Sequence, residues 1–149
     1  MIFPYVRYEL EPTRTIPSGE IYRPLIPIRI FGPNRSIQVL GLLDTGADHV
    51  FVSASLAEVL GIEASRKTET ACGAGGHEVA MWPGSVDIQI VQGRESYRWR
   101  TLVGFLVGVD EPPIAYLGHV GFLEHFRASF DFGARSVELS PLAEPVKAV

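Results

Sequence analysis

Val39-Leu-Gly-Leu-Leu-Asp44-Thr45-Gly46-Ala47-Asp48 is the stretch that decides the fold. An apolar strand ends at a carboxylate, which is followed by a small hydroxyl residue and a glycine. The strand holds the backbone, the Thr45 hydroxyl can hydrogen-bond around the turn, and Gly46 permits close approach of another backbone. Two interpretations are open at this point. Asp44 either closes an Asx turn, which is common at strand ends, or is presented for chemistry.

The rest of the chain predicts a mainly β fold of short elements. Glycine at 15 residues and proline at 11 favour many turns. Residues 25–31 and 36–43 form strand-like runs around the turn 32–35. Further strands are expected at 5–10, 85–91, 96–107, 129–132 and 137–139, with a pair of strand arms within 69–82 around the glycine-rich stretch 73–76.

Two short helices are expected. In residues 53–61, Ser55 and Glu58 have the spacing of a capping box, and Gly61 suits the left-handed residue after a helix end. Residues 121–128 carry Phe122 and further apolar residues at helical spacing.

Size and composition bound the function. A chain of 149 residues with 46% apolar residues fits one globular domain. The net charge of −4 and the scattered basic residues argue against nucleic-acid binding, and no apolar run is long enough to span a membrane. The presence of one cysteine, Cys72, excludes an internal disulfide. Cys72 is expected to be a small apolar filler, and the alternative is an oxidation-sensitive thiol near the glycine-rich stretch. The N-terminus has no signal-peptide pattern, so a cytoplasmic location is expected, with no membrane partner.

Three motifs in order resemble the retropepsin-like aspartic peptidases. Leu42-Leu-Asp-Thr-Gly-Ala-Asp48 is similar to the active-site segment of that family, and Ala115-Tyr-Leu-Gly118 is similar to its second motif. Between them lies the glycine-rich hairpin 72–78, where the family places its flap. The resemblance covers most of residues 25–139. It implies a single-lobe aspartic-peptidase β-barrel with a flap hairpin.

The resemblance also implies an activity and an assembly. Aspartic peptidases use two facing carboxylates that share a proton, one polarising the scissile carbonyl and the other activating water. Only one Asp-Thr-Gly occurs here, because Asp131-Phe-Gly133 and Asp87-Ile-Gln89 lack the hydroxyl–glycine turn. The second carboxylate is therefore expected to be Asp44 of an identical chain in a homodimer.

The resemblance also implies which residues form the site, at the positions that match the family's motifs. Asp44, Thr45 and Gly46 are the expected catalytic residues. A polypeptide substrate is expected to meet residues of the same turn, of the flap and of the second motif, namely Ala47, Asp48, Gly73, Ala74, Gly75, Gly76, Leu117 and Gly118. Apolar walls are expected from Val50, Phe51, Val52 and Trp82. For Trp82 the alternative is burial in the core or an interface, which is the more common place for a single aromatic residue. No cofactor or metal is expected, because the histidines and Cys72 form no ligand set.

Two positions bear on how the site works. Ala47 lacks the hydroxyl that could stabilise a charged carboxylate, so a less acidic working range is expected. In viral members an arginine after the second-motif glycine pairs with the aspartate that corresponds to Asp48, but here the residue is His119. His119 either pairs with Asp48 or is satisfied by a backbone carbonyl.

The expected organisation is an N-terminal strand and arm at 1–24, the peptidase domain at 25–140 and a flexible tail at 141–149. The function expected first is aspartic endopeptidase. The alternatives are a weak or inactive module of the same fold that binds peptides or dimerises, and a structural subunit in which Asp44 only closes a turn.

Overall fold

A closed barrel forms the centre of the computed structural model, which describes residues 1–73 and 75–142. The barrel consists of six strands in the order β4, β5, β10, β6, β9 and β8, and β4 also pairs with β8 to close the ring. These strands are β4 (Leu25–Phe31), β5 (Ser36–Leu43), β6 (Phe51–Ser53), β8 (Glu78–Gln92), β9 (Glu95–Leu106) and β10 (Ala115–Leu117). The mainly β prediction is confirmed, with 55% strand and 6% helix.

Alternation of burial along the strands explains the barrel. Ile26, Ile28 and Ile30 of β4 point inward and are at most 1% exposed, whereas Arg29 between them is exposed. Every second residue of a strand lies on the same face, so this pattern places one face in the core. Burying each isoleucine contributes about 1.5–3 kcal/mol. The predicted strands 25–31 and 36–43 match β4 and β5.

The longest hairpin is β8–β9, which pairs from Met81↔Leu106 to Gln92↔Glu95. The strand expected at 85–91 is thus the second half of a single 15-residue strand. Before it, β7 (Glu69–Cys72) pairs with the start of β8, from Glu69↔Met81 to Cys72↔Glu78. This pairing confirms the two strand arms expected around the glycine-rich stretch.

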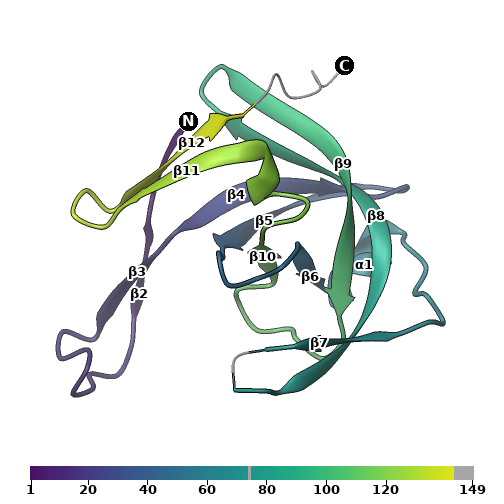
Figure 1. Ribbon diagram of the computed structural model, residues 1–149, viewed down its shortest axis with the longest axis horizontal. Coiled ribbons are helices and arrows are strands. Elements are labelled where there is room, and N and C mark those ends of the chain that lie inside the picture. The colour runs from purple at the N-terminus through teal and green to yellow at the C-terminus, as the bar shows by residue number, and fades with distance from the viewer. Residues whose placement is uncertain (74, 143–149) are drawn as a thin grey trace.

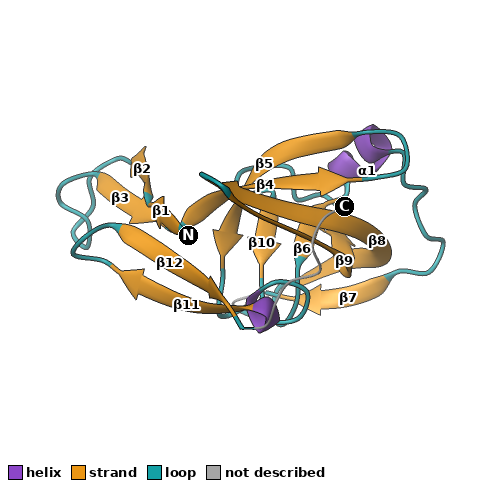
Figure 2. Cartoon of the chain, turned by 90° about the horizontal axis from the view of Figure 1, so that it is seen from above, coloured by secondary structure: helices purple, strands orange, loops and turns teal. Residues whose placement is uncertain are grey.

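A smaller sheet joins the two ends of the described chain. Strand β1 (Ile2–Pro4) pairs with β12 (Ser136–Pro141), which also pairs with β11 (Phe126–Asp131). Figure 2 shows this sheet beside the barrel, on the side opposite α1. Pro141 belongs to β12, and the Leu142 amide donates to the His125 carbonyl. Residues 143–149 of the expected tail lie outside the described residues.

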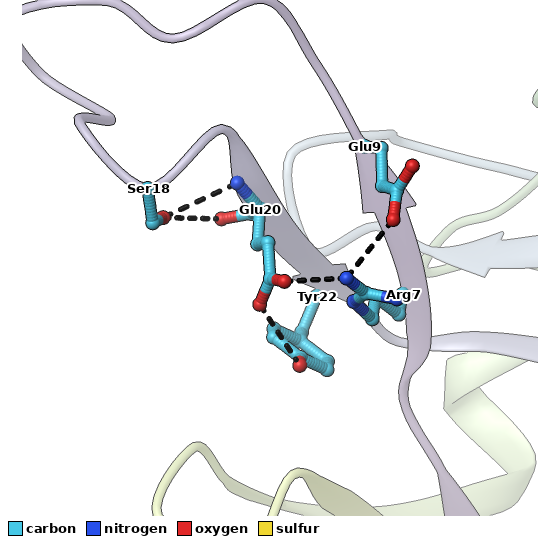
Figure 3. A network of polar contacts seen from close by, with 5 residues as sticks. All are labelled: Arg7, Glu9, Ser18, Glu20 and Tyr22. Carbon is cyan, nitrogen blue, oxygen red and sulfur yellow. Dashed lines mark hydrogen bonds and ion pairs between the residues drawn. The ribbon is translucent and has the colours of Figure 1, made fainter.

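A hairpin projects from the barrel between β1 and β4 (Figure 1). It consists of β2 (Val6–Glu9) and β3 (Glu20–Arg23), so the strand expected at 5–10 is confirmed in its central part. The guanidinium of Arg7 binds the carboxylates of Glu9 and Glu20, and the Tyr22 hydroxyl also contacts Glu20 (Figure 3). The Arg7 contact holds the pKa of Glu20 below its usual range.

The helix predicted at 53–61 is α1 (Ser55–Leu60), but its expected capping box is wrong. The N-cap is Ala54, and no side chain caps the helix. Before the helix, the Ser53 hydroxyl accepts the backbone amide of Ser55 at 3.3 Å, whereas the sequence predicted that Ser55 would be the accepting residue. Gly61 ends the helix with φ of 77°, as expected.

The helix predicted at 121–128 is also wrong in extent. Only the 3₁₀ turn η1 (Leu123–His125) forms, and Phe126 already begins β11. Phe122 and Phe126 are both buried, 5.4 Å apart between ring centres, with Trp99 against both. Their spacing reflects a shared aromatic cluster and not a helical face.

No helix in the described part of the chain is long and apolar enough to cross a membrane.

Candidate active site

Asp44 follows the last residue of β5 and opens a tight turn. Its backbone amide donates to the Leu117 carbonyl at 3.2 Å, which anchors the turn to β10. Its side-chain Oδ1 accepts the Gly46 amide at 2.8 Å, and its carbonyl accepts the Ala47 amide at 3.2 Å. Asp44 is half-buried, whereas Thr45 and Gly46 are exposed. The Asx turn is therefore present, and it holds the carboxylate at the surface by a backbone hydrogen bond.

Position 46 favours glycine because the Asp44 carboxylate lies close to it. A Cβ at this position would lie 3.2 Å from Asp44 Oδ1, closer than ordinary van der Waals contact. A side chain at position 46 would therefore push against the group that the turn presents.

The second motif, residues 115–118, lies directly against the Asp44 turn. In β10, Leu117 pairs with Leu43 of β5 in parallel, while Tyr116 pairs with Phe51 of β6 in the antiparallel sense. After β10, the His119 amide donates to the Ala47 carbonyl at 3.0 Å, and the Val120 amide donates to the Asp48 carbonyl at 2.9 Å. The residues 44–48 and 117–120 are thus joined backbone to backbone. These bonds bring together segments that lie about seventy residues apart in the sequence.

Gly118 allows the two segments to approach. A Cβ there would lie 2.4 Å from the His49 carbonyl oxygen and 2.5 Å from that of Ala47. Leu117 is fully buried and Gly118 is buried as well. Within one chain, Leu117 and Gly118 therefore pack against the buried side of the Asp44 turn, and that side is not open to solvent.

His119 does not pair with Asp48. Its Nε2 lies 2.7 Å from the backbone carbonyl oxygen of Thr45, so the second of the two sequence interpretations is the observed one. Asp48 is exposed, and its carbonyl, not its carboxylate, is bound by the second-motif segment.

Gly73, Gly75 and Gly76 lie between β7 and β8, whose hairpin is drawn along the lower part of the molecule in Figure 1. Gly75 and Gly76 have φ of 83° and 77°, which disfavours other residues there. Gly73, Gly75 and Gly76 are exposed, and no atom lies within 4 Å of a Cβ built on Gly76. These three glycines are therefore open to solvent in the single chain. Ala74, also expected to contact substrate, lies outside the described residues.

Two sequence expectations about this region are wrong. Cys72 is exposed on β7 and is not an apolar filler, because β7 lies at the edge of the sheet. Val50, Val52 and Trp82 are buried in the core at 0%, 0% and 4% exposure, so they do not form walls open to substrate. Trp82 stacks on Phe105 at 4.4 Å. Phe51 alone of the four is half-buried, against the His49 ring.

The two other aspartates considered in the sequence have separate roles. Asp131 accepts the Ala134 amide at 2.8 Å in the β11–β12 turn. Asp87 binds Arg100 at 2.8 Å and Arg98 at 2.9 Å, and these guanidinium groups hold its pKa below the usual range. Within the described residues, neither supplies a second carboxylate to the Asp44 turn. No cluster of three potential metal ligands occurs there either.

Two contacts that the sequence did not indicate hold the second motif in place. The Trp99 indole Nε1 donates to the Gly121 carbonyl at 2.8 Å, and Glu124 Oε1 accepts the Gly121 amide at 2.6 Å. Gly121 therefore has both backbone groups satisfied by side chains. No local motif marks Trp99, because its partner is far away in sequence.

The family model for aspartyl protease matches residues 26–100, which is half of the chain and includes the Asp44 turn and the β7–β8 hairpin. The chain belongs to this family. No curated protein matches the chain. Among solved structures, a retropepsin-like aspartic protease from Rickettsia conorii is similar with a TM-score of 0.50 and 20% identity, over 89% of this chain and 97% of that one. This likeness supports the retropepsin-like fold. EIAV protease, complexed with the inhibitor HBY-793, is similar with a TM-score of 0.38 and 25% identity, over 64% of this chain and 81% of that one.

Within the aspartyl protease family, the geometry allows a specific chemistry. One carboxylate is held at the surface by a backbone donor and is open to solvent on its exposed side. The reaction expected for this family requires a second carboxyl group in the opposite protonation state.

Proposed function

We propose that this chain is an aspartic endopeptidase whose active form is a homodimer. The observation that carries the proposal is the Asp44 turn, in which a half-buried carboxylate is fixed by the Gly46 amide beside two exposed residues. In the proposed dimer, a second chain brings its own Asp44 against this turn. The two carboxylates then share one proton, because like charges at short distance do not both ionise.

In the proposed reaction, the protonated carboxyl polarises the scissile carbonyl. The charged carboxylate accepts a proton from water, which attacks the carbonyl carbon. Thr45 and Gly46 maintain the turn. The tetrahedral intermediate then loses its C–N bond, the proton taken from water passes to the leaving nitrogen, and the dimer returns to its singly protonated state.

The substrate in this proposal is an extended polypeptide. Ala47 and Asp48 border the carboxylate, and the exposed hairpin tip with Gly73, Gly75 and Gly76 covers the bound segment. An extended segment can bond to strand edges through its backbone, so affinity comes from the main chain and preference from side chains. The peptidase domain of this proposal spans 25–140, with residues 1–24 as an added arm.

Substitution of the carboxylate tests the catalytic part. Asp44→Asn keeps the size of the side chain and removes the ionisable pair, so peptide cleavage is expected to fall below detection while the dimer persists. Asp131→Asn is the matched control, because Asp131 also accepts a backbone amide in a turn. Cleavage by D44N at the wild-type rate would refute the proposal.

Dilution tests the dimer. Specific activity is expected to fall as protein concentration drops below the dimer dissociation constant, in step with the sedimentation coefficient. Activity per chain that stays constant in a purely monomeric sample would contradict the shared site.

The alternative function, a peptide-binding or dimerisation module without turnover, differs in one measurement. Such a module would bind a statine-type inhibitor or a peptide without cleaving it in wild type. The cytoplasmic location expected from the sequence is part of the proposal, and cell fractionation tests it.

A further inference from the structure

His119 is an exposed histidine whose ring reaches the active-site turn. Its Nε2 lies 2.7 Å from the Thr45 carbonyl oxygen. We propose that His119 is a positioning residue, which holds the Asp44-Thr45-Gly46 turn in its working shape by donating a hydrogen bond from Nε2. The catalytic meaning of this inference rests on the proposed peptidase function, whereas the bond itself can be tested without it.

The direction of the bond follows from its acceptor. A carbonyl oxygen only accepts, so Nε2 must carry a proton. The neutral tautomer protonated at Nε2 and the imidazolium both satisfy this requirement. The neutral tautomer protonated at Nδ1 does not, because its Nε2 has a lone pair that faces the oxygen. The structure therefore assigns one neutral tautomer to His119.

The Thr45 carbonyl differs from three other carbonyls of the segment 44–48 in what it accepts. The carbonyls of Asp44, Ala47 and Asp48 each accept a backbone amide, at 3.2, 3.0 and 2.9 Å respectively. Among the described residues, the donor to the Thr45 carbonyl is the His119 side chain. The exposed tip of the turn is thus the part that relies on a side chain, and it is the part next to the carboxylate.

The base of the His119 side chain is itself fixed. Its amide donates to the Ala47 carbonyl at 3.0 Å, and its own carbonyl accepts the Glu124 amide at 2.9 Å. Because the backbone of His119 is fixed, its ring holds the turn at a fixed position relative to the second motif. Small displacements of a reacting group cost large factors in rate, so loss of this contact is expected to lower kcat more than KM.

His49 provides an internal contrast for a spectroscopic test. Its Nδ1 lies 3.2 Å from the Val50 carbonyl oxygen, so His49 is expected to be protonated at Nδ1. Long-range ¹H–¹⁵N correlation spectra of the full chain, labelled at histidine, distinguish the two tautomers at neutral pH. We expect the Nε2-protonated pattern for His119, assigned by its loss in His119→Asn, and the opposite pattern for His49. An Nδ1-protonated His119 would overturn the proposal.

Kinetics of matched variants test the positioning role. His119→Phe keeps a ring without a donor and is expected to lower kcat about tenfold, with KM within twofold. His119→Gln places an amide donor near the position of Nε2 and is expected to recover most of the loss. The shorter His119→Asn does not reach and is expected to resemble H119F. His125→Phe makes the same exchange at a ring for which the described residues show no contact with the turn, and phenylalanine keeps the ring that packs against Trp99 at 5.3 Å, so this variant is expected to leave kcat unchanged.

Hydrogen exchange separates this inference from the peptidase proposal. The Gly46 and Ala47 amides are bound to Asp44 and so report the shape of the turn. We expect faster exchange of both amides in H119F than in wild type and H125F, whether or not the wild type cleaves peptides. If wild type is inactive, the proposed function fails, and the exchange result alone decides the positioning role. Unchanged exchange, or an unchanged kcat in an active H119F enzyme, would overturn it.

Discussion

A Cβ on Gly118 would lie 2.5 Å from the carbonyl oxygen of Ala47, and that single relationship shows how closely the second motif approaches the active-site turn. The Cβ would be attached to the backbone directly after β10, and the carbonyl belongs to the main chain between β5 and β6. Neither can shift to make room as the end of a flexible side chain could. The approach brings the His119 and Val120 amides into hydrogen-bond range of the Ala47 and Asp48 carbonyls.

Gly118→Ala is therefore expected to lower the free energy of unfolding by about 2–3 kcal/mol, the scale of overpacking in a well-filled interior. Denaturant unfolding of the variant measures this loss. Gly73→Ala is the control, because the nearest atom to its Cβ would be the His77 carbonyl oxygen at 3.8 Å. Its stability is expected to stay within about 0.5 kcal/mol of wild type. Equal stabilities of the two variants would show that the approach is looser than described.

Gly46→Ala tests the carboxylate position. The added methyl would lie 3.2 Å from Asp44 Oδ1 and displaces it, so kcat is expected to fall about 10- to 100-fold. Stability should change little, because Gly46 is exposed. Steady-state cleavage kinetics measure the effect.

Gly133→Ala is the matched control for this variant. Its Cβ would lie 3.3 Å from Asp131 Oδ1 in the β11–β12 turn, nearly the same steric relationship away from the site. Its kcat is expected to equal that of wild type. A similar loss in both variants would point to a general effect of alanine on the fold.

The ionisation of Asp87 makes the free energy of unfolding depend on pH. Its pKa is lowered by hydrogen bonds from Arg100 and Arg98, so its contribution is present above the unfolded value of about 3.9 and is lost as pH falls through the lower folded value. Asp87→Asn is expected to cost about 1–3 kcal/mol at pH 7. The difference between wild type and variant should shrink below about pH 4. Thermal unfolding followed from pH 7 to pH 3 measures it.

Glu138→Gln, an exposed carboxylate on β12, serves as the control for this series. Its unfolding curves should follow wild type at every pH. A D87N penalty that stays constant down to pH 3 would show that ionisation of Asp87 is not its source.

Trp99→Phe tests the support of the second motif. The change leaves the Gly121 carbonyl without its indole donor, at an expected cost of about 1–3 kcal/mol beyond the loss of ring area. Trp82→Phe makes the same ring change in the core, where the indole stacks on Phe105. W99F is therefore expected to unfold at lower denaturant than W82F. The reverse order would refute the role given to the hydrogen bond.

Local patterns predicted the barrel strands well where burial alternates. Strands β4 and β5 match their expected ranges because their apolar residues recur at every second position. The helix expected at 121–128 failed because Phe122 and Phe126 serve an aromatic cluster with Trp99, and contact with a distant ring overrode local periodicity. The capping box failed for a related reason: the Ser53 hydroxyl accepts the Ser55 amide and itself donates to the distant Asp110 carboxylate at 3.0 Å.

The sequence by itself determined the order of the three motifs, the turn at Asp44 and the need for glycine at its third position, because these depend on neighbouring residues. Only the tertiary structure decided that His119 contacts the Thr45 carbonyl and that Trp82 and Val50 lie in the core. These outcomes depend on which strands meet across long stretches of chain, and pairing partners are selected by the packing of the whole barrel. The partner of a side chain such as His119 therefore depends on the tertiary structure and not on the residues next to it in the sequence.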